Sequence, residues 1–569
     1  MSKPIPSDLE IAQNATLWPI SQIAQESSIS TDRLEPYGKY VAKVLLDEQS
    51  TAQKALAKGS KYVVVTAVTP TPLGEGKTAT SVSLAQGMAH IGQSAILTLR
   101  QPSMGPTFGI KGGAAGGGYS QIVPMEKLNL HLTGDFHAVT AAHNLLAAMI
   151  DNHLHHGNAL GINPHSISWR RVLDVNDRSL RNIVIGLGEP MDGIPRQTGF
   201  DITSASEIMV ILSLASSFAD LRQRLAKIVI GYNFDGEPIT AQDLKADGSL
   251  AVILADAIHP NLLQTLEHTP ALIHAGPFGN IATGNSSVVA DYVGLEHADY
   301  VITEAGFGAD MGAERFFNVK CRVSGLKPDA AVLVATVRSL KAHSGKYTIK
   351  PGKPLPQELM AENPQDVSAG AANLKKHIEI VRNFGVQPVV AINAFPTDHP
   401  SEHQVIQEIA SAAGARVAIH HGVAQGGAGA SQLAQVLTEA CQDSSQLNYT
   451  YQDEDSLETK LNKVATQVYG AEGIDISPTA ARQLKTYQDL GYTNLPVVIA
   501  KTHLSISADP SLKGAPTGWT LPVNQVRLAA GAGYVYAICG NMRTMPGLAK
   551  EPAAERIGFN SAGTMIGLF

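Results

Sequence analysis

The chain has 569 residues, with 43 basic and 50 acidic side chains and a formal net charge of −7. The two signs are interspersed, so the composition excludes the basic surface that typifies proteins binding nucleic acid or anionic membranes and favours small-molecule partners. The length exceeds that of one hydrophobic core and predicts about three domains.

Three cysteines, Cys321, Cys441 and Cys539, lie far apart in the chain. This spacing favours neither a disulfide framework nor a zinc ribbon, and it predicts a reducing, cytoplasmic environment. The longest apolar stretch, residues 208–221, is interrupted by serines, so neither an exported nor a membrane-anchored chain is expected.

A β-branched run at residues 62–68 leads into a phosphate-loop pattern. The common motif Gly-x-x-x-x-Gly-Lys-Ser/Thr fits at Gly76, Lys77 and Thr78, whereas Thr71 replaces its first glycine. Lys77 is expected to reach the β- and γ-phosphates of ATP, and the hydroxyl of Thr78 is expected to bind Mg²⁺. The predicted nucleotide-binding residues are Thr71, Pro72, Leu73, Gly74, Glu75, Gly76, Lys77 and Thr78.

The segment after this loop carries apolar residues on more than one helical face, so it predicts a helix buried on several sides. Further short β-rich runs alternate with helical patterns along the chain. They occur at residues 95–99, 183–186, 228–230, 271–274, 300–303, 331–337, 388–392, 417–420, 495–500 and 534–539. This alternation predicts an α/β fold: a P-loop-type, mostly parallel sheet with helices on both faces, plus additional smaller α/β domains.

Arg100 follows the second of these strands and precedes a glycine-rich segment at residues 109–118. Open α/β sheets bind ligands at the carboxyl ends of their strands, and a guanidinium binds carboxylates and phosphates through two hydrogen bonds. The pattern therefore predicts a functional loop, with a flexible linker as the alternative for the glycine-rich segment.

Residues 133–137 lead into an apolar helical pattern that ends in several histidines at residues 151–156. No His-Glu-x-x-His pattern occurs, so a dedicated histidine metal site is not predicted. Asp135 is a candidate ligand-binding carboxylate, or equally an N-terminal helix cap.

Glu304 directly follows a predicted strand and opens a glycine-rich turn that contains Asp310. Either carboxylate could hold Mg²⁺ through water, because that ion keeps several waters. The alternative is that Glu304 bonds loop amides. Phe395 and Pro396 follow another strand, where the exposed ring favours a platform for a flat ligand over a core position.

Prolines cluster at residues 346–364, and polar residues replace the apolar rhythm at residues 442–455. Both features predict domain edges. The predicted domains are residues 1–350, a P-loop nucleotide-binding domain with an inserted subdomain; residues 351–450, a second α/β domain; and residues 451–569, a third.

These segments together resemble formate–tetrahydrofolate ligase, also called 10-formyltetrahydrofolate synthetase, nearly from end to end. The matching segments are residues 71–78, 109–118, 134–138, 169–188, 198–203, 304–310, 395–398, 514–518 and 544–548. The resemblance implies that a formate oxygen attacks the γ-phosphorus of ATP to give formyl phosphate. N10 of tetrahydrofolate then attacks its carbonyl carbon, giving 10-formyltetrahydrofolate, ADP and phosphate.

The resemblance also implies residue roles. Arg100 would hold formate and then the acyl phosphate, and Phe395 would stack on the pterin, which places the folate side in residues 351–450. A homotetramer activated by a monovalent cation is implied as well.

The chain departs from the family pattern at several positions. Gln101 stands where glutamate is usual, Thr283 where histidine is usual, Val423 where tryptophan is usual and Asn541 where aspartate is usual. The sequence therefore leaves two alternatives to the ligase. One is a divergent paralogue that binds nucleotide with little or no catalysis, and the other is a carboxylate-activating ATPase with a different acceptor.

Overall fold

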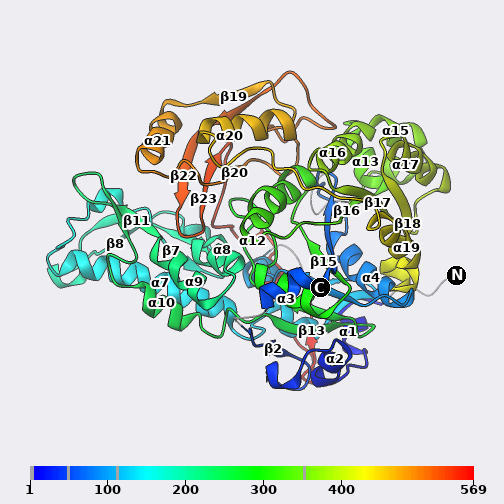
Figure 1. Ribbon diagram of the computed structural model, residues 1–569, viewed down its shortest axis with the longest axis horizontal. Coiled ribbons are helices and arrows are strands. Elements are labelled where there is room, and N and C mark those ends of the chain that lie inside the picture. The colour runs from blue at the N-terminus through cyan, green and yellow to red at the C-terminus, as the bar shows by residue number, and fades with distance from the viewer. Residues whose placement is uncertain (1–5, 48–50, 110–114, 350–353, 569) are drawn as a thin grey trace.

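The computed structural model describes residues 6–47, 51–109, 115–349 and 354–568. Within these ranges the centre is a twelve-stranded sheet of order β1-β2-β13-β14-β4-β15-β3-β16-β17-β18, with β6 beside β13 and β5 beside β6 (Figure 1). Its strands are β1 (Leu34–Pro36), β2 (Ala42–Val44), β13 (Asn261–Thr265), β14 (Pro270–Ile273), β4 (Ala95–Leu99), β15 (Tyr300–Glu304), β3 (Lys61–Ala67), β16 (Ala330–Ala335), β17 (Gln387–Asn393), β18 (Arg416–His420), β5 (Gly116–Gly117) and β6 (Ser120–Val123).

From β14 to β18, every neighbouring pair in this order runs parallel. The carboxyl ends of these strands therefore lie at one edge of the sheet. This is the edge at which open α/β sheets bind ligands.

Helices cover both faces of the sheet. The alternation of side chains along β3 explains why: Val63 and Val65 belong to one buried cluster and Tyr62 and Val64 to another. Helices α4 (Lys77–His90) and α19 (Ser431–Ala440) contribute to the first cluster, and α11 (Val288–His297) and α16 (Ala371–Asn383) to the second. Helix α4 is buried on nearly all sides, so the predicted fold class and this predicted helix are confirmed.

A second group of elements extends from one side of the sheet (Figure 1). It contains helices α7 (Asp135–His155), α8 (Glu207–Leu214), α9 (Phe218–Ala226) and α10 (Asp247–Ile253). Strand β8 (Ile183–Ile185) pairs antiparallel with β9 (Arg196–Thr198), and β11 (Val229–Tyr232) pairs antiparallel with β12 (Pro238–Thr240). The expectation that residues 183–186 and 228–230 continue the parallel sheet was therefore wrong. Local apolar pattern identifies a strand but does not fix its partner, and these strands pair with neighbours in the chain.

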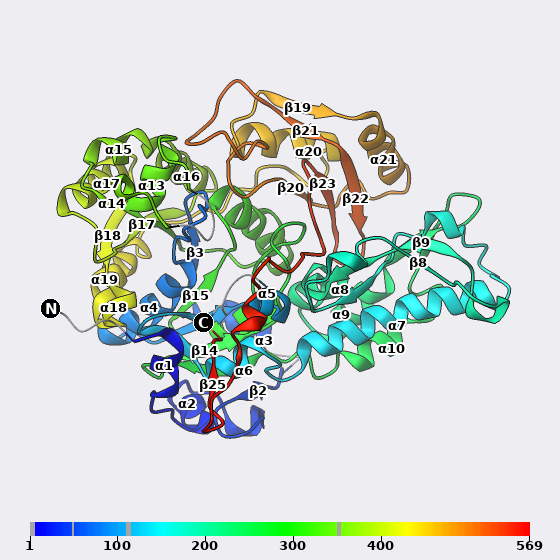
Figure 2. The same ribbon diagram turned by 180° about the vertical axis from the view of Figure 1, so that it is seen from behind.

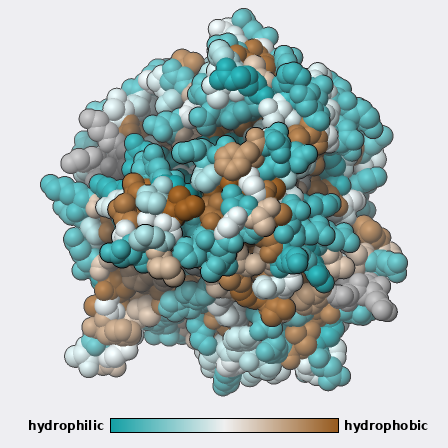
Figure 3. Space-filling model, turned by 90° about the vertical axis from the view of Figure 1, so that its left-hand side faces the viewer, coloured by the Kyte–Doolittle hydropathy of each residue, from teal (hydrophilic) through white to brown (hydrophobic). Residues whose placement is uncertain are grey.

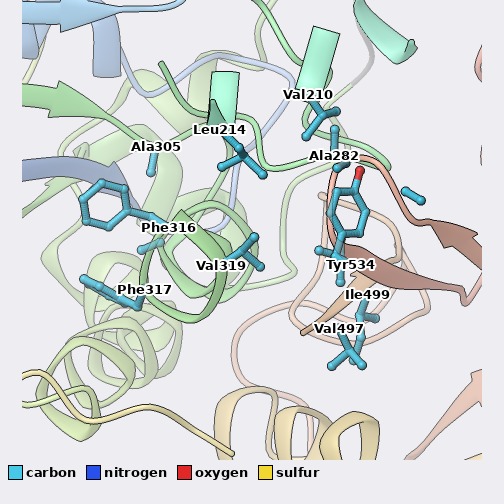
Figure 4. Packing of buried hydrophobic residues seen from close by; sticks show 14 of the residues in the cluster. Val210, Leu214, Ala282, Ala305, Phe316, Phe317, Val319, Val497, Ile499 and Tyr534 are labelled. Carbon is cyan, nitrogen blue, oxygen red and sulfur yellow. The ribbon is translucent and has the colours of Figure 1, made fainter. Parts of the chain in front are cut away.

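The C-terminal portion adds smaller sheets. Strand β23 (Tyr534–Ile538) lies between β20 (Val497–Ala500) and β22 (Gln525–Ala529), and β19 (Gly473–Ile476) pairs with β21 (Thr520–Val523) beside α20 (Leu457–Lys463) and α21 (Pro478–Asp489). Figure 4 shows Ile499 and Tyr534 of this portion in one apolar cluster with Val319 and Ala282. Shared core packing thus joins the C-terminal portion to the central body.

The last residues return to the central body, as Figure 2 shows for the red end of the ribbon. Gln13 Nε2 donates a hydrogen bond of 3.0 Å to the carbonyl of Met565, and Leu568 is buried in the cluster that contains α4. The chain therefore ends beside its own N-terminal region.

The predicted domain limits stay predictions. Strands β17 and β18 lie in the predicted second domain, yet they pair in the same sheet as β16 of the first. Residues 110–114 of the predicted glycine-rich segment and residues 350–353 of the proline cluster lie outside the described residues.

Candidate active site

The phosphate-loop segment joins β3 to α4, in the order that the sequence predicts. Gly74 and Gly76 have φ angles of 75° and 76°, a region that glycine adopts without steric cost. A Cβ atom at Gly76 would lie 2.4 Å from Nδ2 of Asn393, which donates to the carbonyl of Glu75 at 3.1 Å. Gly76 immediately precedes α4, so the loop leads into the unpaired backbone N–H groups of a helix start, where anions bind.

Glu75 braces the loop from within. Its buried Oε1 accepts hydrogen bonds from the backbone N–H of Thr71 at 2.7 Å and from the Thr71 hydroxyl at 3.0 Å. Burial raises the pKa of Glu75, and the positive charge of Lys77 acts in the opposite direction. Thr71 thus closes the loop onto Glu75, whereas Pro72 and Gly74 are exposed at its outer side.

Thr78 connects the loop to the neighbouring strand β15. Its Oγ1 donates to Glu304 Oε2 at 2.7 Å, so Glu304 bonds a loop hydroxyl rather than a loop amide. Lys77 is half-buried and forms no ion pair among the described residues. The loop therefore presents a cation and a hydroxyl–carboxylate pair at the carboxyl edge of the sheet.

Arg100 lies at the same edge, at the end of β4. Its Nη1 donates to the carbonyl of Pro277 at 3.2 Å, and its Nη2 lies 4.0 Å from Glu304 Oε1. Burial lowers the pKa of Arg100 and the Glu304 carboxylate raises it, but the guanidinium stays charged at neutral pH. A Cβ atom at Gly306 would lie 3.1 Å from Arg100 Nη2, so the turn after β15 passes close to the guanidinium.

These side chains surround a cavity of about 250 Å³. Thr78, Arg100 and Glu304 all line it, so the structure brings together three residues that the sequence places in separate segments. Gln101 and Ser204 also line it, and within the described residues their buried side-chain polar atoms have no hydrogen-bond partner. Such groups require a polar partner, so the cavity is suited to a small polar ligand.

A second group of candidate residues follows β17 and β18 along the same edge. Phe395 is half-buried and Pro396 is exposed, so this segment is accessible to a ligand. The guanidinium of Arg338 lies 4.1 Å from the centre of the Phe395 ring and covers one of its faces. Only the other face is left for stacking. Arg338 was missed from the sequence because no motif links α13 (Val337–His343) to residue 395.

Comparisons with known proteins identify the family of the chain. Residues 6–569 match the family model described as "Formate--tetrahydrofolate ligase". The chain belongs to the formate–tetrahydrofolate ligase family. Proteins of that name are 66% identical over 563 residues in Cutibacterium acnes, 61% over 564 residues in Saccharopolyspora erythraea and 56% over 565 residues in Roseiflexus castenholzii. Each alignment covers 99% of this chain and 100% of the relative.

Val423, one of the departures from the family pattern, lies in α18 (Gly422–Gln425), just after β18. Its carbonyl accepts a hydrogen bond from the N–H of Tyr119 at 2.9 Å, and a Cβ atom at Gly118 would lie 2.0 Å from that oxygen. Val423 therefore packs against the glycine-rich segment. The Ala394 N–H donates to the backbone carbonyl of His420 at 3.1 Å, which places the ends of β17 and β18 side by side.

Two other departures from the family pattern differ in their surroundings. Thr283 is buried, and its hydroxyl has no hydrogen-bond partner among the described residues. Asn541 is exposed.

Asp135 does not line the cavity beside Arg100. It is buried in the first turn of α7, where its Oδ1 lies 2.8 Å from Lys43 Nζ and its Oδ2 accepts from Asn261 at 2.8 Å. The helix cap is Gly134, and no side chain caps the helix. Asp135 thus balances a buried lysine, and neither of the two sequence interpretations describes these contacts.

Asp310 is similarly engaged, because its Oδ2 lies 2.7 Å from Lys501 Nζ in a buried ion pair. In the part of the chain that the structure describes, no cluster of histidine, cysteine, aspartate and glutamate side chains is arranged to hold a metal ion. Among the same residues, no helix is long and apolar enough to cross a membrane. The three cysteines are buried free thiols.

Proposed function

We infer that the chain is an ATP-dependent ligase that joins formate to tetrahydrofolate through formyl phosphate. The products are 10-formyltetrahydrofolate, ADP and phosphate. Membership of the formate–tetrahydrofolate ligase family supports the overall reaction. The observation that carries the site assignment is the cavity in which Thr78 of the phosphate loop, Glu304 and Arg100 meet.

ATP lies with its phosphates against residues 71–78. The loop amides and the start of α4 bind the phosphate oxygens, and Lys77 contacts the β- and γ-phosphates. The Thr78 hydroxyl and the Glu304 carboxylate, 2.7 Å apart, are the oxygen donors that Mg²⁺ takes alongside water. Mg²⁺ held there would neutralise phosphate charge during transfer.

Arg100 binds formate in the cavity and orients one of its oxygens toward the γ-phosphorus. That oxygen forms the new P–O bond as ADP leaves. Formate is a weak nucleophile that needs no base, so fixed positive charge and position are the main requirements. Arg100 then holds the resulting formyl phosphate by its phosphate oxygens.

Tetrahydrofolate binds beside the ends of β17 and β18. Its pterin stacks on the open face of Phe395, next to Pro396, while Arg338 fills the opposite face. N10 attacks the carbonyl carbon of formyl phosphate, phosphate leaves and the N10 proton passes to solvent.

We further propose a cytoplasmic homotetramer activated by a monovalent cation, with domains close to residues 1–350, 351–450 and 451–569. Exposed apolar side chains of residues 183–198 support self-association: Val184, Leu187, Met191 and Ile194. Figure 3 views the molecule from the side where this hairpin lies, and hydrophobic residues interrupt its hydrophilic surface. Light scattering of the purified chain tests the assembly, and a monomer at micromolar concentration would contradict it.

The activity is tested with purified protein, ATP, formate and tetrahydrofolate. The expected result is 5,10-methenyl product after acidification, formed only when all three substrates are present. Phosphate release with formate but without folate product would indicate a different acceptor. Nucleotide binding without either product would indicate the non-catalytic paralogue.

A further inference from the structure

Thr69 lies between β3 and the phosphate loop, and its backbone N–H, carbonyl and hydroxyl all form hydrogen bonds. Its backbone N–H donates to Asn373 Oδ1 at 3.1 Å, and its Oγ1 accepts from Asn373 Nδ2 at 2.9 Å. The same Oγ1 lies 2.9 Å from His377 Nε2, and its carbonyl accepts from His343 Nε2 at 2.9 Å. Thr69 and these three partners are buried.

The partners come from elements that are remote in sequence from the loop. His343 ends α13, whereas Asn373 and His377 stand four residues apart on one face of α16. Asn373 Nδ2 also donates to the carbonyl of Gly514 at 2.8 Å. The root of the phosphate loop is thereby tied to two helices and to the C-terminal portion.

Both imidazoles are neutral at physiological pH. Burial lowers the pKa of His343 and of His377 to about 4. The charged groups that face them are Asp310, Lys376, Lys501 and Lys513, and Asp310 is itself paired with Lys501 at 2.7 Å. A carbonyl can only accept, so His343 carries its proton on Nε2. These contacts are therefore uncharged hydrogen bonds that persist across the neutral pH range.

The loop has a few contacts of its own, and Thr69 adds to them from the side of β3. Pro70 and Pro72 lack backbone N–H groups, and Pro72 and Gly74 are exposed. Among the described residues, the side-chain hydrogen bonds that hold the loop include the Glu75–Thr71 brace, Asn393, which donates to the carbonyl of Glu75, and Thr78, which donates to Glu304. Thr69 stands two residues before the loop, and its hydrogen bonds fix the chain at that point.

We propose that Asn373, His377 and His343 are positioning residues that hold Thr69, and through it the phosphate loop, in the conformation that binds ATP. This inference rests on the proposed function, since it assumes that residues 71–78 bind the nucleotide. It assigns a role in substrate binding to buried residues outside the cavity. A purely structural network would instead affect stability without distinguishing the substrates.

The first test is the matched pair Thr69→Val and Thr69→Ser. Valine preserves shape but removes the hydroxyl, whereas serine keeps the hydroxyl and removes a methyl group. We expect Thr69→Val to raise the KM for ATP about tenfold, as loss of one positioned hydrogen bond does, with the KM values for formate and tetrahydrofolate unchanged. Thr69→Ser should stay within about twofold of the wild type for all three substrates.

A second pair keeps the test informative if Thr69→Val folds poorly. His377→Gln retains a donor or acceptor near the Nε2 position, whereas His377→Leu removes it. His377→Leu should raise the KM for ATP and His377→Gln should restore most of the loss, with thermal unfolding recorded for each protein. Equal ATP constants within each pair, or parallel changes for all three substrates, would overturn the proposal.

Calorimetric titration with ATP separates this inference from the proposed function. If the wild type makes no formyltetrahydrofolate, the ligase assignment fails. The ATP dissociation constants of the same pairs of variants still test whether Asn373, His377 and His343, the Thr69 clamp, position the loop. Weaker ATP binding by Thr69→Val than by Thr69→Ser supports it. Equal binding contradicts it.

Discussion

The proposed nucleotide side and the proposed folate side of the site lie along the same edge of one sheet, yet they are built differently. On the nucleotide side Thr78 donates to Glu304, and Glu75 accepts from Thr71. On the folate side the accessible platform is Phe395, with Arg338 behind it. Phosphoryl transfer requires charges that are already fixed, whereas a flat ring binds by stacking on an exposed face. Substitutions on each side should therefore affect different substrates.

The largest effect is expected for Lys77→Ala. Removal of a positioned cation from phosphoryl transfer should lower kcat about a thousandfold, equivalent to about 4 kcal/mol. Lys485→Ala is the matched control, because Lys485 pairs with Asp489 on the surface of α21. Steady-state rates at saturating substrates give the comparison, and similar kcat values for the two variants would remove Lys77 from the reaction.

Arg100→Lys should be the next most severe change. Lysine keeps the charge but loses the planar pair of donors, so kcat/KM for formate should fall about a hundredfold. The KM for tetrahydrofolate should stay within a factor of about two. Initial rates at varied formate concentration measure the effect. A variant with unchanged formate kinetics would show that the cavity does not bind formate.

Phe395→Leu should affect only the proposed folate side of the site. Loss of a stacking face costs about 1 to 3 kcal/mol, so the KM for tetrahydrofolate should rise about tenfold to a hundredfold. The KM for ATP should not change. A parallel rise in both constants would contradict the separation of the two sides.

Val423→Trp is expected to improve folate binding. A second aromatic face at the end of β18 should lower the KM for tetrahydrofolate about fivefold, at the lower end of the stacking range because Val423 packs against residue 118. Val423→Ala serves as the control for altered packing. No difference from the wild type would refute the assignment of this position to the pterin.

Glu207→Gln should change neither the KM for ATP nor the KM for tetrahydrofolate. Glu207 accepts hydrogen bonds from the N–H groups of Gly531 and Ala532, and burial raises its pKa to about 7 from an ordinary 4.5. The folded state thus binds this proton more tightly than the unfolded state, so stability from this group falls as pH rises from about 4.5 to about 7. The glutamine variant should lose that slope in denaturant titrations at pH 5 and 7. If the free energy of unfolding of the variant changes with pH as it does in the wild type, a group other than Glu207 titrates in this range.

The order strand, loop, helix around residues 71–78 could be predicted because local composition controls it. Gly76 and Lys77 indicate a phosphate loop, and β-branched runs indicate buried strands. Position on the sheet edge was likewise predictable for Arg100, Glu304 and Phe395, since each lies at the end of a strand or within two residues after it. For Asp135, the sequence contained no sign of the buried Lys43 that is its partner.

Partners that are distant in the chain were beyond the reach of sequence patterns. Arg338 behind Phe395, Ser204 in the cavity and the Thr69 clamp each join segments separated by at least 57 residues. The antiparallel pairing of residues 183–185 with residues 196–198 was missed for a different reason: the partner is near in the chain, but an apolar run does not specify which strand it pairs with.

The sequence by itself determined the family, the phosphate loop and the alternation of strands and helices, since these depend on residue types and short spacings. Tertiary structure alone decided which charges meet. The order β4-β15-β3 brings Arg100, Glu304 and Thr78 to one cavity, although 226 residues separate Thr78 from Glu304. Parallel strands require crossover connections, so strands that are adjacent in the sheet are far apart in the sequence. Only the folded sheet brings the residues of the site together.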